Sequence, residues 1–550
     1  MSLTINHLVI APILLPLAAA ALMVPLTERQ RMLKAAIGVT SALASLAIAL
    51  VLLHFADSKP PSATASTSVY LMADWPAPFG IVLVVDRLSA LMLTLASVVV
   101  FAGLVYSIAR WHSVGPHFHS LVQFLLAGLN GVFLTGDLFN LFVFFEVMLA
   151  ASYGLALYGS GAPRVKAALQ YIAINLAASA LFLVGVSLIY GVTGTLNMAD
   201  LAARAPFLPE SDRMLFESGA AILGIAFLVK AGMWPLGFWL ANTYSVVAAP
   251  VAAIFSIMTK VGIYVILRLW LMIFGADGGA SADFGTGWLL AGGIATVAFG
   301  SIGLLAAQDL PRLTSYCVVV SSGTLLAAIA VGNAGVTGGA LFYLVSSTLA
   351  ISACFLLIEL IERSRMPGAD VLAVTLEALG DEETEQDSGD PIGIAIPATM
   401  AVLGIGFAAC TLLLAGLPPL TGFIAKFLML NALFLPGGAP DGVPPAALSW
   451  TLLAVLLSSG FAIMISMMRA GIRVFWIPIE SEVPSVRFLE MVPIVLLLFI
   501  CAALTVQAGP VTRYMQDTAQ SLHTPQTYVR DVLSEPRVTP PSPKAEEAAQ

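Results

Sequence analysis

The segment from Thr135 to Ala150 reads TGDLFNLFVFFEVMLA, and it places the carboxylate of Glu146 inside a long apolar run. A helix that begins after Asp137 would carry Glu146 about 12 Å into the apolar layer, at ~1.5 Å of rise per residue. An ionisable group at that depth in a membrane is costly, so it needs a partner or a function. Asp137 is out of phase with Glu146, and we expect it to start the helix.

The rest of the chain has the composition of a membrane protein. Of its 550 residues, 59% are hydrophobic and 10% are charged, whereas soluble domains are about 25% charged. The mean hydropathy is +0.95. The net charge of −8 does not indicate a nucleic-acid partner, because much of the acidity lies in two short polar segments. The cysteines form no CxxC pair, so the sequence predicts no disulfide framework, metal site or cofactor; they are Cys317, Cys354, Cys410 and Cys501.

Apolar runs that could cross a bilayer of ~30 Å, which takes about 20 helical residues, occur fourteen times in the chain. The sequence therefore predicts an all-α polytopic membrane protein with about 14 transmembrane helices. The runs fall at residues 7–25, 33–55, 84–108, 119–136, 138–159, 165–192, 216–242, 246–274, 288–307, 313–333, 337–362, 395–436, 447–468 and 488–508.

The seventh and twelfth runs are predicted to be broken. Pro235 lies inside the seventh, and Pro418 and Pro419 lie near the centre of the twelfth, which is too long for one straight crossing. The strings MWPLGFW and LPPLTGF, which contain these prolines, occupy matching positions in two five-helix blocks, 119–274 and 288–468. An odd number of helices in each block predicts an inverted repeat.

Basic residues predict the orientation, because cytoplasmic loops carry an excess of Lys and Arg. One set of alternate loops holds twelve: Arg29, Arg31, Lys34, Arg110, Arg164, Lys166, Arg312, Arg363, Arg365, Arg469, Arg473 and Arg487. The other set holds five: Lys59, Arg87, Arg204, Arg213 and Arg268. We therefore expect a protein of the inner (cytoplasmic) membrane with both termini outside.

The predicted organisation has three N-terminal helices (1–118), the two five-helix blocks and one last helix (488–508). Two polar segments stand apart from these spans, an acidic cytoplasmic loop at 377–390 and a tail at 511–550. Their composition predicts disordered or loosely attached chain.

Four ionisable residues remain inside the spans after loops and helix ends are set aside: Glu146, Lys230, Lys260 and Lys426. Each would cost roughly 2.5–3.5 kcal/mol at a helix centre, so we expect them to meet in the protein interior. A salt bridge that only fixes helix packing is one interpretation for a Glu–Lys pair. Three lysines with one glutamate favour a proton relay, because a buried lysine without a counterion gives up its proton readily.

The lysines at 230 and 426 lie beside the predicted helix breaks, where backbone dipoles and water can gather around an ion. Asn175 and Ser256 lie in mid-span and are expected to form interhelical hydrogen bonds. Ser256 is also one turn before Lys260, close enough to solvate it.

Several stretches together resemble the D subunit of the Mrp-type (Mnh/Pha) multisubunit monovalent cation/proton antiporter. They are GDLFNLFVFFEVMLAASYGL, KAGMWPLGFWLANTYSVVAAPVAAIFSIMTKVGIYVILRLW, QDLPRLTSYCVVVSS and GLPPLTGFIAKFLML. The resemblance covers most of the fourteen-helix region. It implies Glu146 paired with Lys230, a central Lys260 and a terminal Lys426, which form a hydrophilic axis across the middle of the membrane.

The chain departs from the family pattern at three positions. Ser346 stands where a histidine is expected, and Gly237 and Ala241 replace a histidine and a proline after the seventh-helix lysine. A serine can hold a water but cannot store charge, so the axis between Lys260 and Lys426 is expected to need water.

The resemblance implies an ion-translocating subunit of a Na⁺(K⁺)/H⁺ antiporter rather than an enzyme, with other antiporter subunits as partners. A second interpretation stays open, since relatives of this family are proton-pumping membrane subunits of complex I-like NADH dehydrogenases and membrane-bound hydrogenases. A third, an assembly subunit with a decayed relay, is disfavoured by the retained glutamate and lysines. No cage of carboxylates and carbonyls is apparent, so the cation can cross in another subunit.

Overall fold

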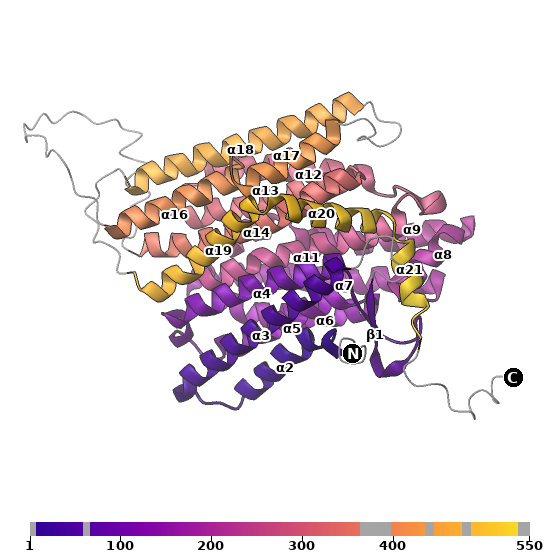
Figure 1. Ribbon diagram of the computed structural model, residues 1–550, viewed down its shortest axis with the longest axis horizontal. Helices are drawn as coiled ribbons and strands as arrows, with labels where there is room; N and C mark the ends of the chain where they lie inside the picture. The colour runs from indigo at the N-terminus through magenta and orange to yellow at the C-terminus, as the bar shows by residue number, and fades with distance from the viewer. Residues whose placement is uncertain (1–6, 59–66, 364–397, 435–444, 476–485, 537–550) are drawn as a thin grey trace, which may run out of the picture.

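The computed structural model describes residues 7–58, 67–363, 398–434, 445–475 and 486–536. Most helices lie side by side along the longest axis of the molecule (Figure 1). The helices are α2 (Ala11–Met23), α3 (Arg31–Ser58), α4 (Arg87–Ile108), α5 (Phe118–Leu134), α6 (Leu138–Ala156), α7 (Ala162–Thr193), α8 (Met198–Arg204), α9 (Glu210–Ala231), α10 (Phe238–Tyr244), α11 (Ala249–Phe274), α12 (Thr286–Ala306), α13 (Leu310–Ala330), α14 (Ala334–Glu362), α16 (Ala398–Ala415), α17 (Thr421–Phe434), α18 (Pro445–Phe475), α19 (Phe488–Val506), α20 (Ala508–His523) and α21 (Gln526–Leu533).

The polytopic helical fold predicted from hydropathy is confirmed. Within the described ranges, 12 helices are long and apolar enough to cross a membrane. Two shorter apolar helices, α2 with 13 residues and α5 with 17, occupy the first and fourth predicted spans. Each of the fourteen predicted spans therefore contains a helix.

The two predicted helix breaks are present, and they have the same local structure. In the seventh span α9 ends at Ala231 and α10 begins at Phe238, and in the twelfth α16 ends at Ala415 and α17 begins at Thr421. Each first half ends at a glycine in the left-handed conformation, Gly232 (φ +74) and Gly416 (φ +77). The next amide closes the turn, Met233 N onto Leu228 O at 3.1 Å and Leu417 N onto Leu412 O at 3.0 Å. Such closure satisfies end carbonyls that lipid could not.

Two helices form the centre of the bundle. The most apolar parts of α11 and α14 are fully buried, and that of α13 is 94% buried. The helix α11 packs against α4, α9, α13 and α14. Polar side chains on α11 and α14 are therefore surrounded by protein rather than by lipid.

Loops from distant parts of the chain meet at each end of the bundle. Arg31 Nη1 donates to Ser113 O (3.2 Å), and Arg487 Nη1 donates to Ala109 O (2.6 Å), so loops from several parts of the chain meet at one end. We call this the basic end. The opposite end carries α8, α21 and a hairpin of β1 (Ser68–Leu71) and β2 (Val82–Val85), in which Ser68 pairs with Val85 and Leu71 with Val82 (Figure 1). We call it the hairpin end.

The expectation of a loosely attached tail is wrong for its described part. The helix α20 packs along α14, and α21 reaches the hairpin end (Figure 1). Residues Tyr514, Thr518 and Leu522 of α20 are buried, and they are four positions apart in sequence. The other residues of α20 are mostly polar, so the composition of this segment does not reveal its buried face. Only the helical spacing of the buried residues could have indicated that α20 packs on the bundle. Residues 537–550 and the acidic loop at 377–390 lie outside the described residues.

Candidate functional site: a row of buried lysines

Four helices carry the ionisable residues that the sequence singled out. Glu146 is on α6, Lys230 on α9, Lys260 on α11 and Lys426 on α17. The three lysines are 7%, 0% and 8% exposed, respectively. Their burial agrees with the predicted position inside the protein. Among the described ion pairs, however, none joins Glu146 to a lysine.

Lys230 is held by a neutral amide. Its Nζ donates to Asn175 Oδ1 on α7 at 2.8 Å, and it lies 5.1 Å from the centre of the Phe145 ring. The lysine is in the last turn of α9, where the helix dipole favours a cation. The expected interhelical hydrogen bond of Asn175 is thus confirmed, with Lys230 as its donor.

The direct Glu146–Lys230 pair implied by the resemblance is absent from this structure. Phe145 presents its ring to the lysine, so the neighbouring Glu146 points elsewhere on the helix. One carboxylate oxygen of Glu146, Oε1, is buried and accepts no hydrogen bond from the described residues. Glu146 still lies close enough to act on Lys230 through its charge. Asp137 starts α6 as predicted, since its Oδ1 accepts from Phe139 N and Asn140 N, both at 2.9 Å.

A small cavity lies between Lys230 and α11. Its lining includes Phe145, Asn175, Lys230, Tyr244 and Met258, and it has ≈ 10 Å³ of space for the centre of a water molecule. That volume is about the minimum that one water needs. Lys230 and Asn175 supply polar contacts for such a water.

Lys260 is held by hydroxyl groups. Its Nζ donates to Ser321 Oγ on α13 at 2.7 Å, and Ser321 Oγ lies 3.0 Å from Ser347 Oγ on α14. One turn earlier on α11, Ser256 Oγ lies 2.7 Å from Ser352 Oγ of α14, as expected for an interhelical bond. One serine pair therefore contacts the Lys260 ammonium, and a second lies one turn earlier on α11.

A second water-sized cavity lies on the way from Lys260 to the twelfth span. It has ≈ 10 Å³ of the same space, and its lining includes Ser321, Ser346, Ser347 and Leu414. Leu414 belongs to α16, one residue before the carbonyl that binds Lys426. Ser346 thus borders a water-sized space between Lys260 and the twelfth span.

Lys426 uses a backbone carbonyl at the helix break. Its Nζ donates to Ala415 O at 3.0 Å, at the C-terminal end of α16. A Cβ on Gly416 would come within 2.9 Å of Lys426 Cδ, and a Cβ on Gly460 within 3.3 Å of its Nζ. The two glycines leave room for the lysine to reach the carbonyl. The predicted position of Lys426 beside a break is confirmed.

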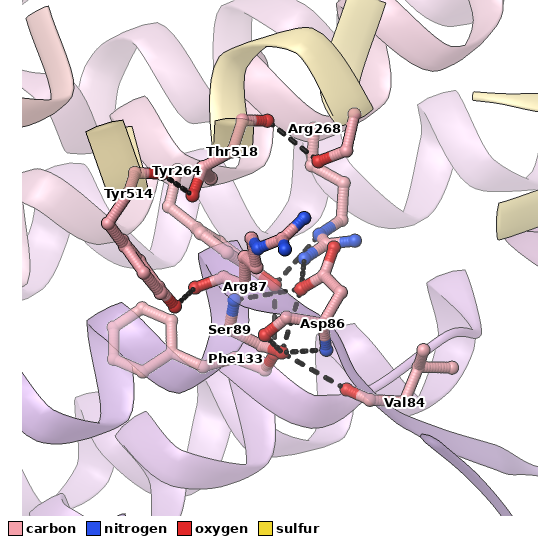
Figure 2. A network of polar contacts seen from close by, with 10 residues as sticks. Val84, Asp86, Arg87, Ser89, Phe133, Tyr264, Arg268, Tyr514 and Thr518 are labelled. Carbon is pink, nitrogen blue, oxygen red and sulfur yellow. Dashed lines mark hydrogen bonds and ion pairs between the residues drawn. The ribbon is translucent and has the colours of Figure 1, made fainter. Parts of the chain in front are cut away.

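The sequence reasoning missed a polar network toward the hairpin end (Figure 2). Arg268 Nη2 forms an ion pair with Asp86 Oδ1 at 2.7 Å, and Arg268 Nε donates to Tyr264 Oη at 2.9 Å. The Tyr264 hydroxyl in turn donates to Phe133 O at 2.8 Å. Hydropathy alone places Arg268 at a helix end. Arg268 lies four residues after Tyr264 and eight after Lys260, so the three share one face of a helix, and this spacing could have indicated the network.

The C-terminal helices close over this network. Tyr514 of α20 donates to Arg87 O at 2.8 Å (Figure 2). The Tyr528 ring of α21 lies 5.4 Å from the Arg268 guanidinium carbon. Asp86 Oδ1 also accepts from Ser89 N at 2.8 Å, so Arg268 and the start of α4 both hold this carboxylate.

These features define a polytopic membrane protein with the architecture of an ion transporter: broken helices, buried lysines at the breaks and a core of polar contacts. The family model described as NADH:quinone oxidoreductase/Mrp antiporter, TM, matches residues 135–438. The chain belongs to this family.

Curated relatives and solved structures agree with the assignment. A protein of Rhizobium meliloti (strain 1021), named as the D subunit of a probable K(+)/H(+) antiporter, is 58% identical over 533 residues, 97% of this chain and 98% of that protein. The D subunit of the Na(+)/H(+) antiporter of Alkalihalophilus pseudofirmus is 33% identical, over 96% of this chain and 100% of the relative. A chain in the structure of the Mrp complex from Dietzia sp. DQ12-45-1b aligns with a TM-score of 0.82 and 25% identity, covering 97% of this chain and 100% of that one.

Proposed function

We propose that this chain is the proton-conducting D subunit of a multisubunit monovalent cation/proton antiporter, and that protons move along Lys230, Lys260 and Lys426. One observation carries the proposal. Each lysine is buried, and each donates to a neutral oxygen, that of Asn175, Ser321 or Ala415. An ammonium group in low dielectric with neutral partners has little to hold its proton, so it can release and regain one.

Glu146 supplies the switch in this proposal. When Glu146 is ionised, its charge favours the protonated form of Lys230. When that charge is neutralised, Lys230 passes its proton toward Lys260 through the water-sized cavity beside Met258. The cavity bordered by Ser346 and Ser347 then serves the step from Lys260 to Lys426. Proton entry releases roughly 2.3 kcal/mol per charge for each 100 mV of membrane potential, which can drive a cation outward.

Potassium is the cation that we propose first, with sodium second. The relative that is 58% identical is named for a K(+)/H(+) antiporter, while one at 33% identity is named for sodium. The near full-length match to antiporter subunits favours this function over proton pumping in a redox enzyme.

The position of Glu146 indicates where a partner subunit lies. Phe139, Val143 and Ala150 form an exposed stripe along α6, and Glu146 lies partly exposed on the same face. A carboxylate in contact with acyl chains would be costly. We therefore place another subunit of the complex against this face. We also propose that the basic end lies in the cytoplasm, that both termini lie outside and that the complex is in the inner membrane, because one set of alternate loops carries most of the Lys and Arg residues.

Exchange measured in everted membrane vesicles that contain the whole complex tests the proposal. Lys230→Ala, Lys260→Ala and Lys426→Ala should each lower cation-dependent proton exchange roughly tenfold or more. Lys166→Ala is the matched control, because Lys166 is exposed near the start of α7. Normal exchange by all three variants in assembled complexes would refute the proposed path.

A further inference from the structure

A column of polar groups runs from Lys260 toward the basic end, apart from the lysine row. It begins with Ser256 on α11, one turn from Lys260, whose Oγ lies 2.7 Å from Ser352 Oγ on α14. Ser352, Leu356 and Glu359 are spaced by four and three residues, so they lie on one face of α14. This face leads from the centre of the bundle to its surface.

Tyr106 of α4 bridges the middle of this column. Its side chain is 1% exposed, and its hydroxyl donates to Leu356 O at 3.1 Å. Leu356 is one turn from Ser352, about 6 Å along the axis at ~1.5 Å per residue. One water with two hydrogen bonds of about 2.8 Å reaches only about 5.6 Å, so a chain of two waters is needed to span this gap.

Glu359 ends the column at the basic end. Its Oε2 accepts from Trp111 Nε1 at 2.8 Å, and its Oε1 pairs with Arg363 Nη2 at 2.9 Å. The Glu359 side chain is 15% exposed, so a titratable carboxylate reaches the surface. Glu359 also interacts electrostatically with Tyr106.

The other direction along α11 leads to an arginine. Tyr264 and Arg268 continue the line of Lys260 toward the hairpin end, where Arg268 is paired with Asp86 (Figure 2). A guanidinium stays protonated in proteins, so it cannot take part in a proton relay. The column traced above therefore leads from Lys260 to the basic end.

We propose that Glu359 is the surface relay residue that exchanges protons with Lys260, through Tyr106, Ser352 and Ser256. The inference rests on the proposed role of Lys260. In the step that releases a proton at the basic end, the ammonium of Lys260 gives its proton to the next oxygen. Each hydroxyl or water in turn accepts one proton and releases its own, and the Glu359 carboxylate gains the last one and passes it to the solvent. No atom other than hydrogen moves, and the column returns to its first state by rotation of the hydroxyls.

The test uses everted vesicles with the assembled complex. Glu359→Gln should lower the maximal exchange rate roughly tenfold or more and leave the KM for the cation unchanged. Glu359→Asp, which keeps the carboxyl, should retain most of the rate. Tyr106→Phe and Ser352→Ala each remove one oxygen and should slow exchange in the same way. If Glu359→Gln fails to assemble, Tyr106→Phe decides.

Glu490→Gln is the matched control. Glu490 binds the same arginine, with Oε1 2.7 Å from Arg363 Nη1, but it lies on α19 and its described hydrogen bonds go to Arg363 and Arg487 rather than to Tyr106, Ser352 or Ser256. We expect this variant to exchange at a near normal rate. Equal slowing by Glu490→Gln and Glu359→Gln would show that only the Arg363 ion pairs matter, and would overturn the inference. Normal exchange by assembled Glu359→Gln and Tyr106→Phe, together with an inactive Lys260→Ala, would also overturn the inference and would leave the proposed function intact. An active Lys260→Ala would instead refute the role of Lys260 in the proposed function.

Discussion

Lys230 Nζ lies 2.8 Å from Asn175 Oδ1, so the amide on α7, not the carboxylate on α6, makes the hydrogen bond to this lysine. The amide accepts the hydrogen bond of the charged lysine without fixing the proton there. An anion in its place would hold the ammonium form. The neutral partner leaves the charge state of Lys230 open to control by the more distant Glu146.

Replacing this amide by a carboxylate should trap the proton. Asn175→Asp places an anion on Lys230 at hydrogen-bond distance, and we expect exchange to fall roughly tenfold or more while the complex still assembles. Asn175→Leu should also slow exchange, because it leaves the lysine without its acceptor. The measurement is decay of an imposed pH gradient in vesicles upon cation addition. An Asn175→Asp variant with normal rates would show that Lys230 need not release its proton.

The exchange rate should be less sensitive to removal of the Ser346 hydroxyl than to filling of the cavity beside it. Ser346→Leu fills ≈ 10 Å³ and should abolish exchange, because no water can then join Lys260 to Lys426. Ser346→Ala keeps the space and should retain a substantial rate. Ser346→His introduces the residue expected in the family, and we expect it to support exchange. The same pH-gradient assay ranks the three variants, and an active Ser346→Leu would exclude a water step here.

The Arg268–Asp86 pair should be strongly coupled in stability. Removing one partner of a buried ion pair costs about 3–5 kcal/mol, and the side-chain exposure of Asp86, 13%, favours the lower part of that range. Arg268→Met should therefore destabilise the protein strongly. Asp86→Asn retains a side chain that can cap α4. We expect the double variant to be less destabilised than the sum of the single ones by at least about 1 kcal/mol. Unfolding in detergent, followed by tryptophan fluorescence, measures the coupling; strict additivity would contradict a buried pair.

The docking of α20 should weaken in acid. Burial lowers the pKa of His523 to about 4, from an ordinary value near 6.5, and its Nε2 lies 3.0 Å from Thr337 Oγ1 on α14. Because the folded pKa is below the unfolded one, the undocked state binds more protons between these values, so docking is lost as pH falls from about 6.5 to about 4. Hydrogen exchange of α20 amides should therefore increase on acidification. His523→Gln removes the titrating group and should flatten this dependence, whereas an unchanged pH profile would assign it to another residue.

Hydropathy and proline positions were sufficient to predict the helical architecture. The broken helices follow from local chemistry, since Gly232 with Pro235 and Gly416 with Pro419 stop a helix regardless of its neighbours. The matching Ala-Gly-x-x-Pro-Leu spacing at both breaks supports the inverted repeat, which stays a prediction. Burial of the lysines also followed from sequence, because the cost of a charge in lipid does not depend on the fold.

The partners of those lysines could not be predicted in the same way. Nothing in the local sequence shows that Phe145 rather than Glu146 faces Lys230, or that Ser321 reaches Lys260. Such contacts depend on the rotation of each helix about its own axis, and that rotation is set by packing against several neighbours at once. The docked α20 was missed for a related reason, since a short amphipathic helix is stable only with a surface to cover.

The sequence by itself determined that this chain crosses the membrane many times, breaks two of its helices and places three lysines and one glutamate inside its spans. These outcomes follow from free energies of transfer and backbone restrictions that act residue by residue. Only the tertiary structure decided which oxygen receives each ammonium group, where water-sized spaces remain and which acidic residue of α14 reaches the basic end. Hydrogen bonds act over about 3 Å, so they are fixed only when helices distant in sequence are brought into contact.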